Sequence, residues 1–178
     1  LPDSVEEIGV DAFAGSDLSR FSAPASLRVL RQGAFYQCRN LSRAVLNEGL
    51  EALGSQESSD ERDWCGVFQE SALREVQLPS TLRTIECNAF RKCLILKSVE
   101  LPEGLARVRF AAFYESGLAS VAFPASLRAL EPVSFADCKS LKTVRFLAGL
   151  EVLGTGERSG VGELWFGVFQ GSAVEEVG

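Results

Sequence analysis

The stretch LPSTLRTIECNAFRKCLILKSVEL, residues 78–101, decides the fold of this chain. It opens on Leu-Pro, places the next apolar residues three apart, and reaches a small residue followed by Phe90. It closes on Leu-x-x-Val-x-Leu, whose alternation predicts a short strand with Val99 and Leu101 facing inward. The proline that follows cannot donate to a strand ladder, so the chain turns there toward an opposite face. The stretch therefore predicts one coil of a larger stack.

The same phrase occurs seven times, with a period of about 22 residues. The repeats start at residues 1, 23, 46, 78, 101, 123 and 146. Each repeat carries one phenylalanine at the same place: Phe13, Phe35, Phe68, Phe90, Phe113, Phe135 and Phe169. Because a single coil cannot bury its apolar side alone, neighbours must stack and share a core. We therefore predict a single right-handed solenoid over residues 1–178. Short parallel strands should form one face and short strands or turns the other, with the phenylalanine rings in a column inside.

A second period lies on top of the first. Three residues after each phenylalanine, serine and cysteine alternate strictly: Ser16, Cys38, Ser71, Cys93, Ser116, Cys138 and Ser172. The cysteine repeats are one residue longer at this point, because they read Cys-x-x-Leu where the serine repeats read Ser-x-Leu or Ser-x-Val. Residues 1–54 also match residues 101–154 without a gap, which indicates that a block of four repeats was duplicated.

The residues from Leu78 to Leu101 resemble the BspA-like class of leucine-rich repeats, and the likeness covers nearly the whole chain. The phrases at 46–54 and 66–73 are similar to arrays common in single-celled algae, dinoflagellates in particular. The resemblance implies a leucine-rich-repeat solenoid that recognises other proteins. Bacterial members of the class are surface adhesins, and protist members are mostly of unassigned role. The class has no catalytic residues to transfer.

The composition excludes several kinds of function. Lys and Arg total 18 against 24 Asp and Glu, a formal charge of −6, which argues against a nucleic-acid-binding surface. The chain has no histidine, so it lacks the commonest general base and the commonest neutral metal ligand. No apolar run is long enough to span a bilayer. We therefore expect a protein without catalytic activity, cofactor or membrane-inserted segment.

Two insertions, at 54–66 and 154–167, depart most clearly from the repeat. Loops that project from a regular scaffold often carry binding residues. The candidate partner-binding residues here are Asp60, Glu61, Arg62 and Trp64 in the first insertion, and Arg158 and Trp165 in the second. The alternative is that each tryptophan folds its own loop back onto the solenoid. The acidic residues lack the ligand spacing of a calcium loop, so we expect no metal site.

The outward side of the Val-x-Leu strands is the other candidate surface, because solenoids commonly bind partners there. It mixes charges of both signs and holds no aromatic residue, so its best candidates are Arg20, Arg43 and Arg145. The alternative is that this face is only solvated.

The five cysteines fall into two groups. Cys38, Cys93 and Cys138 recur every second repeat, about 10 Å apart, which is too far for a disulfide and favours buried thiols. Cys65 and Cys87 each lie three residues before a phenylalanine in adjacent repeats, so a bridge between them stays open.

The functional prediction is a non-catalytic scaffold that binds another protein through its insertions and strand face, as a peripheral subunit of a larger assembly. The alternative is a cell-surface adhesion module. Neither end of the chain carries a polar cap. We therefore expect the array to continue or to be covered at both ends.

Overall fold

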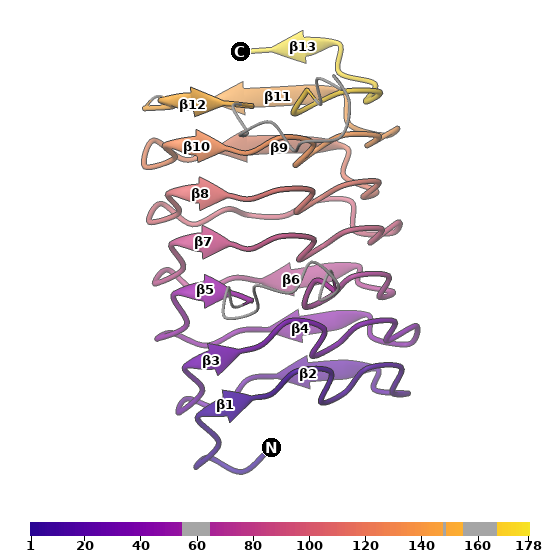
Figure 1. Ribbon diagram of the computed structural model, residues 1–178, viewed down its shortest axis with the longest axis vertical. Coiled ribbons are helices and arrows are strands. Elements are labelled where there is room, and N and C mark those ends of the chain that lie inside the picture. The colour runs from indigo at the N-terminus through magenta and orange to yellow at the C-terminus, as the bar shows by residue number, and fades with distance from the viewer. Residues whose placement is uncertain (55–64, 148, 155–166) are drawn as a thin grey trace, which may run out of the picture.

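The computed structural model describes residues 1–54, 65–147, 149–154 and 167–178. The chain winds into stacked coils, with the N-terminus at one end of the stack and the C-terminus at the other (Figure 1). Each coil runs once along each of two opposite faces, and every strand pairs in parallel with strands of neighbouring coils. The predicted right-handed leucine-rich-repeat solenoid is therefore confirmed.

One face, which we call the narrow face, consists of two-residue strands in a two-stranded and a five-stranded sheet. Its strands are β1 (Glu7–Ile8), β3 (Val29–Leu30), β5 (Ala52–Leu53), β7 (Thr84–Ile85), β8 (Arg107–Val108), β10 (Ala129–Leu130) and β12 (Val152–Leu153). In every narrow-face strand from β1 to β10, the second residue is buried, because its side chain belongs to the hydrophobic core. Leu153 of β12 is 54 % exposed, and among the described strands β12 pairs only with β10.

The opposite, broad face consists of two three-stranded sheets. Its strands are β2 (Arg20–Ser22), β4 (Arg43–Val45) and β6 (Glu75–Gln77) in one sheet, and β9 (Ser120–Phe123), β11 (Thr143–Phe146) and β13 (Glu176–Val177) in the other.

The prediction of a strand that ends at Leu101 is wrong, because residues 96–101 form no strand in the structure. The predicted inward residue Val99 is nevertheless buried, while Ser98 and Glu100 beside it are exposed. Sequence alternation reports side-chain burial, and burial at Val99 does not require backbone pairing with β6 or β9. The broad face is consequently split into two halves at this coil.

The interior holds the seven repeat phenylalanines in one column. Neighbouring ring centroids are 4.9–5.7 Å apart, and the rings are stacked nearly parallel along most of the column. The five central rings have no exposed surface, whereas Phe13 and Phe169 at the two ends are partly exposed. Two further rings, Phe21 and Phe123, pack against this column from the broad face. The column therefore ties each coil to both of its neighbours.

The backbone around each phenylalanine adopts an unusual conformation that repeats in every coil. The second residue after the phenylalanine has a positive φ in all seven coils: Gly15, Gln37, Glu70, Lys92, Glu115, Asp137 and Gly171. Only two of these are glycine, so the conformation is strained at the other five. It is held by hydrogen bonds to the next coil, as when Lys92 N donates to Tyr114 O at 2.8 Å and Phe90 N donates to Ala112 O at 2.7 Å.

The alternating serines and cysteines form a second internal column. The thiol of Cys93 donates to Phe68 O at 3.1 Å, and that of Cys138 donates to Phe113 O at 3.1 Å. Each thiol also lies near the hydroxyl of the serine one coil earlier, as with Ser116 and Cys138 at 3.3 Å. Cys38, Cys93 and Cys138 are fully buried. Burial raises the pKa of the Cys93 thiol to about 12, and it raises the pKa of Cys138 as well.

This column predicts a selective pattern of alkylation. The thiolate is the reactive form of cysteine, and burial together with a raised pKa suppresses it. At pH 8 iodoacetamide should therefore label Cys87, the one exposed cysteine, faster than Cys38, Cys93 and Cys138, whose buried thiols the reagent cannot reach. Peptide mass spectrometry of native and urea-unfolded protein would measure this, and the unfolded chain should label at all five positions. Labelling of the three column cysteines at the native rate of Cys87 would contradict their place in the core.

Candidate recognition surfaces

The broad face separates the three arginines proposed from the sequence. Arg20 and Arg43 are cross-strand neighbours on β2 and β4, and Arg43 forms an ion pair with Glu75 of β6 at 3.3 Å. Arg145 lies on β11 beside Ala122 of β9, in the other sheet. Five coil steps separate β2 from β11, or about 24 Å at the usual strand spacing. The structure therefore brings Arg20 and Arg43 together and leaves Arg145 apart.

Arg43 and Glu75 are half-exposed, so their ion pair is worth little, ~0–1 kcal/mol. Within the described part of the chain, Arg20 and Arg145 form no ion pair, and both side chains are exposed. These two arginines are available to a partner without first breaking an interaction.

The residues proposed in the insertions, Asp60, Glu61, Arg62, Trp64, Arg158 and Trp165, lie outside the described residues. The points where the chain leaves the solenoid are described. The first insertion follows β5 and the second follows β12, and these are the two outer strands of the five-stranded narrow-face sheet. Four strand steps separate them, about 19 Å. Both insertions therefore start from the same side of the solenoid.

Between these two points lies an apolar cluster separate from the main core. Ala111, Val133 and Ala136 are buried there, and Phe110 and Tyr114 pack against them while remaining partly exposed. We call these five residues the edge patch. The guanidinium carbon of Arg91 lies 5.1 Å from the centre of the Tyr114 ring, a cation–π arrangement. Aromatic side chains and arginine are the residues most often found at the centres of protein interfaces.

The edge patch lies outside the strand face and the insertions, the two regions in which the sequence predicts binding residues. Its signal was present: Phe110 and Tyr114 are aromatic residues outside the repeat phenylalanine position. Both lie in one coil, and their packing against Val133 and Ala136 of the next coil arises only once the chain is folded.

A group of ionised side chains spans three coils next to the edge patch. Arg109 lies between two carboxylates, at 3.0 Å from Glu86 and 3.2 Å from Glu131, and Glu131 also accepts from the backbone N–H of Phe110 at 3.1 Å. The three side chains are 14–21 % exposed. Burial raises the pKa of Glu86, and Arg109 opposes that rise. The group joins the coils of β7, β8 and β10 electrostatically.

The structure does not join Cys65 to Cys87 by a disulfide. A Cβ built on Gly33 would be 3.4 Å from the Cβ of Cys65, so Cys65 lies against the preceding coil. Cys87 instead lies close to Arg109 and Glu86. Burial raises the pKa of the Cys87 thiol, and the positive charge of Arg109 opposes that rise. The first insertion interrupts the regular path of the chain before Cys65, which explains why the sequence register did not fix this pair.

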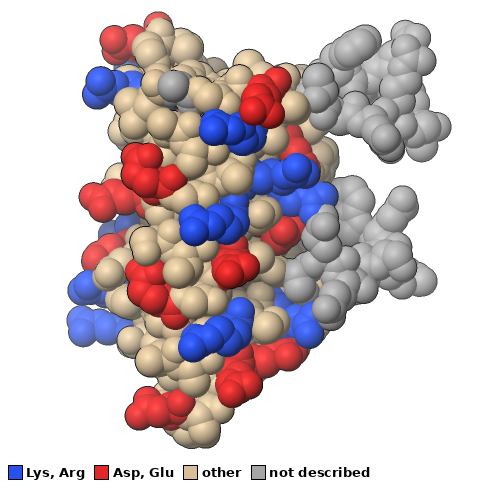
Figure 2. All heavy atoms as spheres, turned by 90° about the vertical axis from the view of Figure 1, so that its left-hand side faces the viewer, with Lys and Arg blue, Asp and Glu red and all other residues tan. Residues whose placement is uncertain are grey.

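Charges on the side formed by the turns before the narrow-face strands are interleaved, with Lys and Arg alternating with Asp and Glu along the stack (Figure 2). This side presents no extended basic area of the kind that binds nucleic acid. Among residues 1–54, 65–147, 149–154 and 167–178, no helix could cross a membrane. Over the same residues, no three acidic or cysteine side chains converge as metal ligands would.

Comparisons with known proteins agree with this geometry. A leucine-rich repeat protein from Bacteroides ovatus superposes with a TM-score of 0.71 and is 25 % identical over 85 % of this chain and 38 % of its own. The leucine-rich repeat protein of T. pallidum gives a TM-score of 0.61 and 27 % identity, over 71 % of this chain and 58 % of its own. The chain thus spans less than two thirds of either relative. No curated protein matches it. The family described as "BspA type Leucine rich repeat region" matches residues 1–59 and 65–159, in six copies. The chain therefore belongs to the BspA-type leucine-rich-repeat family.

Proposed function

We propose that this chain is a non-catalytic scaffold that binds a protein partner, as a peripheral subunit of a larger assembly. The observation that supports this most is the edge patch, which exposes parts of Phe110 and Tyr114 between the starting points of the two insertions. The partly exposed ring of Tyr114 next to Arg91 matches the composition of interface centres, and an insertion on either side matches the usual place of binding residues. Arg20 and Arg145 on the broad face would extend the contact.

The test is capture of the partner by the intact protein, followed by mass-spectrometric identification. Tyr114→Ala should reduce recovery of the partner about tenfold or more, since the loss of a central aromatic residue at an interface is costly. Tyr36→Ala is the matched control, because Tyr36 also directly follows a repeat phenylalanine but lies in a coil outside the edge patch.

A variant that lacks residues 55–63 and 155–163 tests the insertions separately and should also lose the partner. Unchanged recovery with both this variant and Tyr114→Ala would refute the proposal. Thermal melting of each variant shows whether a loss reflects unfolding.

A further inference from the structure

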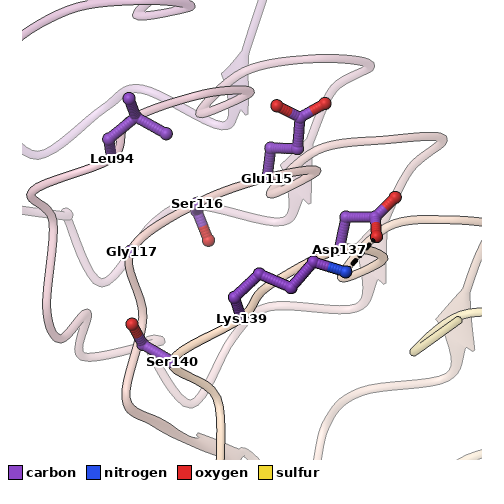
Figure 3. A pocket seen from close by; sticks show the side chains of 7 residues that line it. All are labelled: Leu94, Glu115, Ser116, Gly117, Asp137, Lys139 and Ser140. Atoms are coloured by element: carbon purple, nitrogen blue, oxygen red, sulfur yellow. Dashed lines mark hydrogen bonds and ion pairs between the residues drawn. The ribbon is translucent and has the colours of Figure 1, made fainter. Parts of the chain in front are cut away.

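A pocket of about 400 Å³ opens on the solenoid surface just past the positive-φ turn. It is lined by Leu94, Glu115, Ser116, Gly117, Asp137, Lys139 and Ser140, from three successive coils (Figure 3). Its volume lies at the small end of ligand pockets, which suits a single side chain. We call it the notch.

The notch follows from the alternating repeat length. The coils of Cys93 and Cys138 each have two residues between the cysteine and the next leucine, whereas the coil of Ser116 between them has only Gly117. The two longer coils therefore protrude on either side of a shorter one. A Cβ on Gly117 would clash with the carbonyl oxygen of Leu94, so glycine at this position lets the shorter coil approach Leu94 closely. Gly117 N donates to Cys93 O at 3.0 Å and fixes that position.

The walls of the notch combine an apolar surface with more negative than positive charges. Leu94 is 62 % exposed, the most exposed large hydrophobic side chain in the middle of the stack. The lining includes two carboxylates, Glu115 and Asp137, and one ammonium, Lys139, so the notch carries one net negative charge. Lys139 is already held by Asp137 at 2.7 Å and by the carbonyl oxygen of Gly171 at 2.8 Å. Glu115 forms no ion pair with any residue the structure describes.

From this geometry we propose that the notch receives an arginine side chain of the protein partner. The aliphatic stem would lie on Leu94, and the guanidinium would bond to the carboxylate of Glu115. Tyr114, the aromatic centre of the edge patch, directly precedes Glu115, and burial together with the nearby carboxylates of Glu115 and Asp137 raises the pKa of its hydroxyl. The notch is thus continuous with the edge patch. The inference rests on the proposed function, because it identifies which residue of the partner the scaffold recognises.

The probe is N-acetyl-arginine amide, titrated into the full chain and followed by ¹⁵N amide chemical shifts. We expect a dissociation constant on the order of 1 mM, with shifts concentrated at Glu115, Ser116, Gly117 and Lys139. N-acetyl-citrulline amide, which has the same shape without the charge, should bind about tenfold more weakly.

Three variants separate the contributions. Glu115→Gln should reduce arginine amide binding to the citrulline level, and Leu94→Ser should weaken both probes equally. Glu103→Gln changes an exposed carboxylate on the turn before β8, outside the lining of the notch, and as the control it should leave both unchanged.

Equal binding of the two probes, shifts located elsewhere, or indifference to Glu115→Gln would overturn the proposal. If the arginine probe fails while Tyr114→Ala still abolishes partner capture, the notch is wrong and the scaffold function stands. Failure of partner capture in both Tyr114→Ala and wild type would count against the scaffold function itself.

Discussion

Replacing Phe90 by alanine should lower the free energy of unfolding by about 3–5 kcal/mol, the usual cost of emptying a buried phenylalanine site. The ring has no exposed surface and is stacked on both sides, with centroid distances of 5.7 Å to Phe68 and 4.9 Å to Phe113. Because the neighbouring coils are held by their own hydrogen bonds, they cannot collapse into the space. The variant therefore loses the transfer energy of the ring and leaves a cavity in the middle of the stack.

Urea denaturation followed by circular dichroism would measure this loss. Phe13→Ala is the matched control, because Phe13 occupies the same column but has only one stacking neighbour among the repeat phenylalanines and is partly exposed. Its substitution should cost clearly less. If Phe90→Ala unfolded at the same urea concentration as wild type, the column could not be what holds the coils together.

Replacing Arg109 by methionine should lower the free energy of unfolding by about 2–3 kcal/mol at pH 7, because it leaves the carboxylates of Glu86 and Glu131 with much less compensation in a partly buried site. Arg107 remains 3.8 Å from Glu131 and retains a small part of the interaction. The matched control is Arg43→Met, which removes an exposed pair with Glu75 and should cost less than about 1 kcal/mol.

The loss at Arg109 should depend on pH in a known direction. Burial raises the pKa of Glu86 above its ordinary value of 4.5, and Arg109 limits that rise. In Arg109→Met the folded-state pKa rises further, so the folded protein binds the proton more tightly than the unfolded chain. The variant should then be closest to wild type below pH 4.5 and should fall behind as the pH rises through the folded-state pKa. A stability difference that is constant between pH 4 and pH 8 would contradict this account.

Much of the solenoid could be predicted from the sequence because its period is carried by the residues that are buried. A phenylalanine in every repeat and a strict serine–cysteine alternation leave few ways to stack the coils. Backbone conformation was less accessible. Lys92 and Glu115 adopt positive φ without being glycine, because their backbone N–H groups donate to carbonyl oxygens of the next coil. No local sequence pattern predicts this backbone conformation.

The candidate sites were harder to predict for a related reason. Leu94 and Glu115 come together through the stacking of coils of unequal length, and neither belongs to the repeating pattern. Arg20 and Arg145 stand out in the sequence as members of one strand face, yet they lie on separate sheets because the coil of Val99 forms no strand. The sequence period identifies the buried residues that neighbouring coils share, whereas the candidate sites consist of residues in which the coils differ.

The serine–cysteine column also restricts how such an array can change in size. The thiol of Cys138 needs the phenylalanine carbonyl and the serine hydroxyl of the coil before it, and that coil must be of the short kind. Loss of one coil would place two long turns in direct succession and would put two thiols where one hydroxyl and one thiol fit. Growth or shrinkage by coil pairs, in steps of about 10 Å, preserves every contact. Arrays with this serine–cysteine column should therefore differ in length by even numbers of coils.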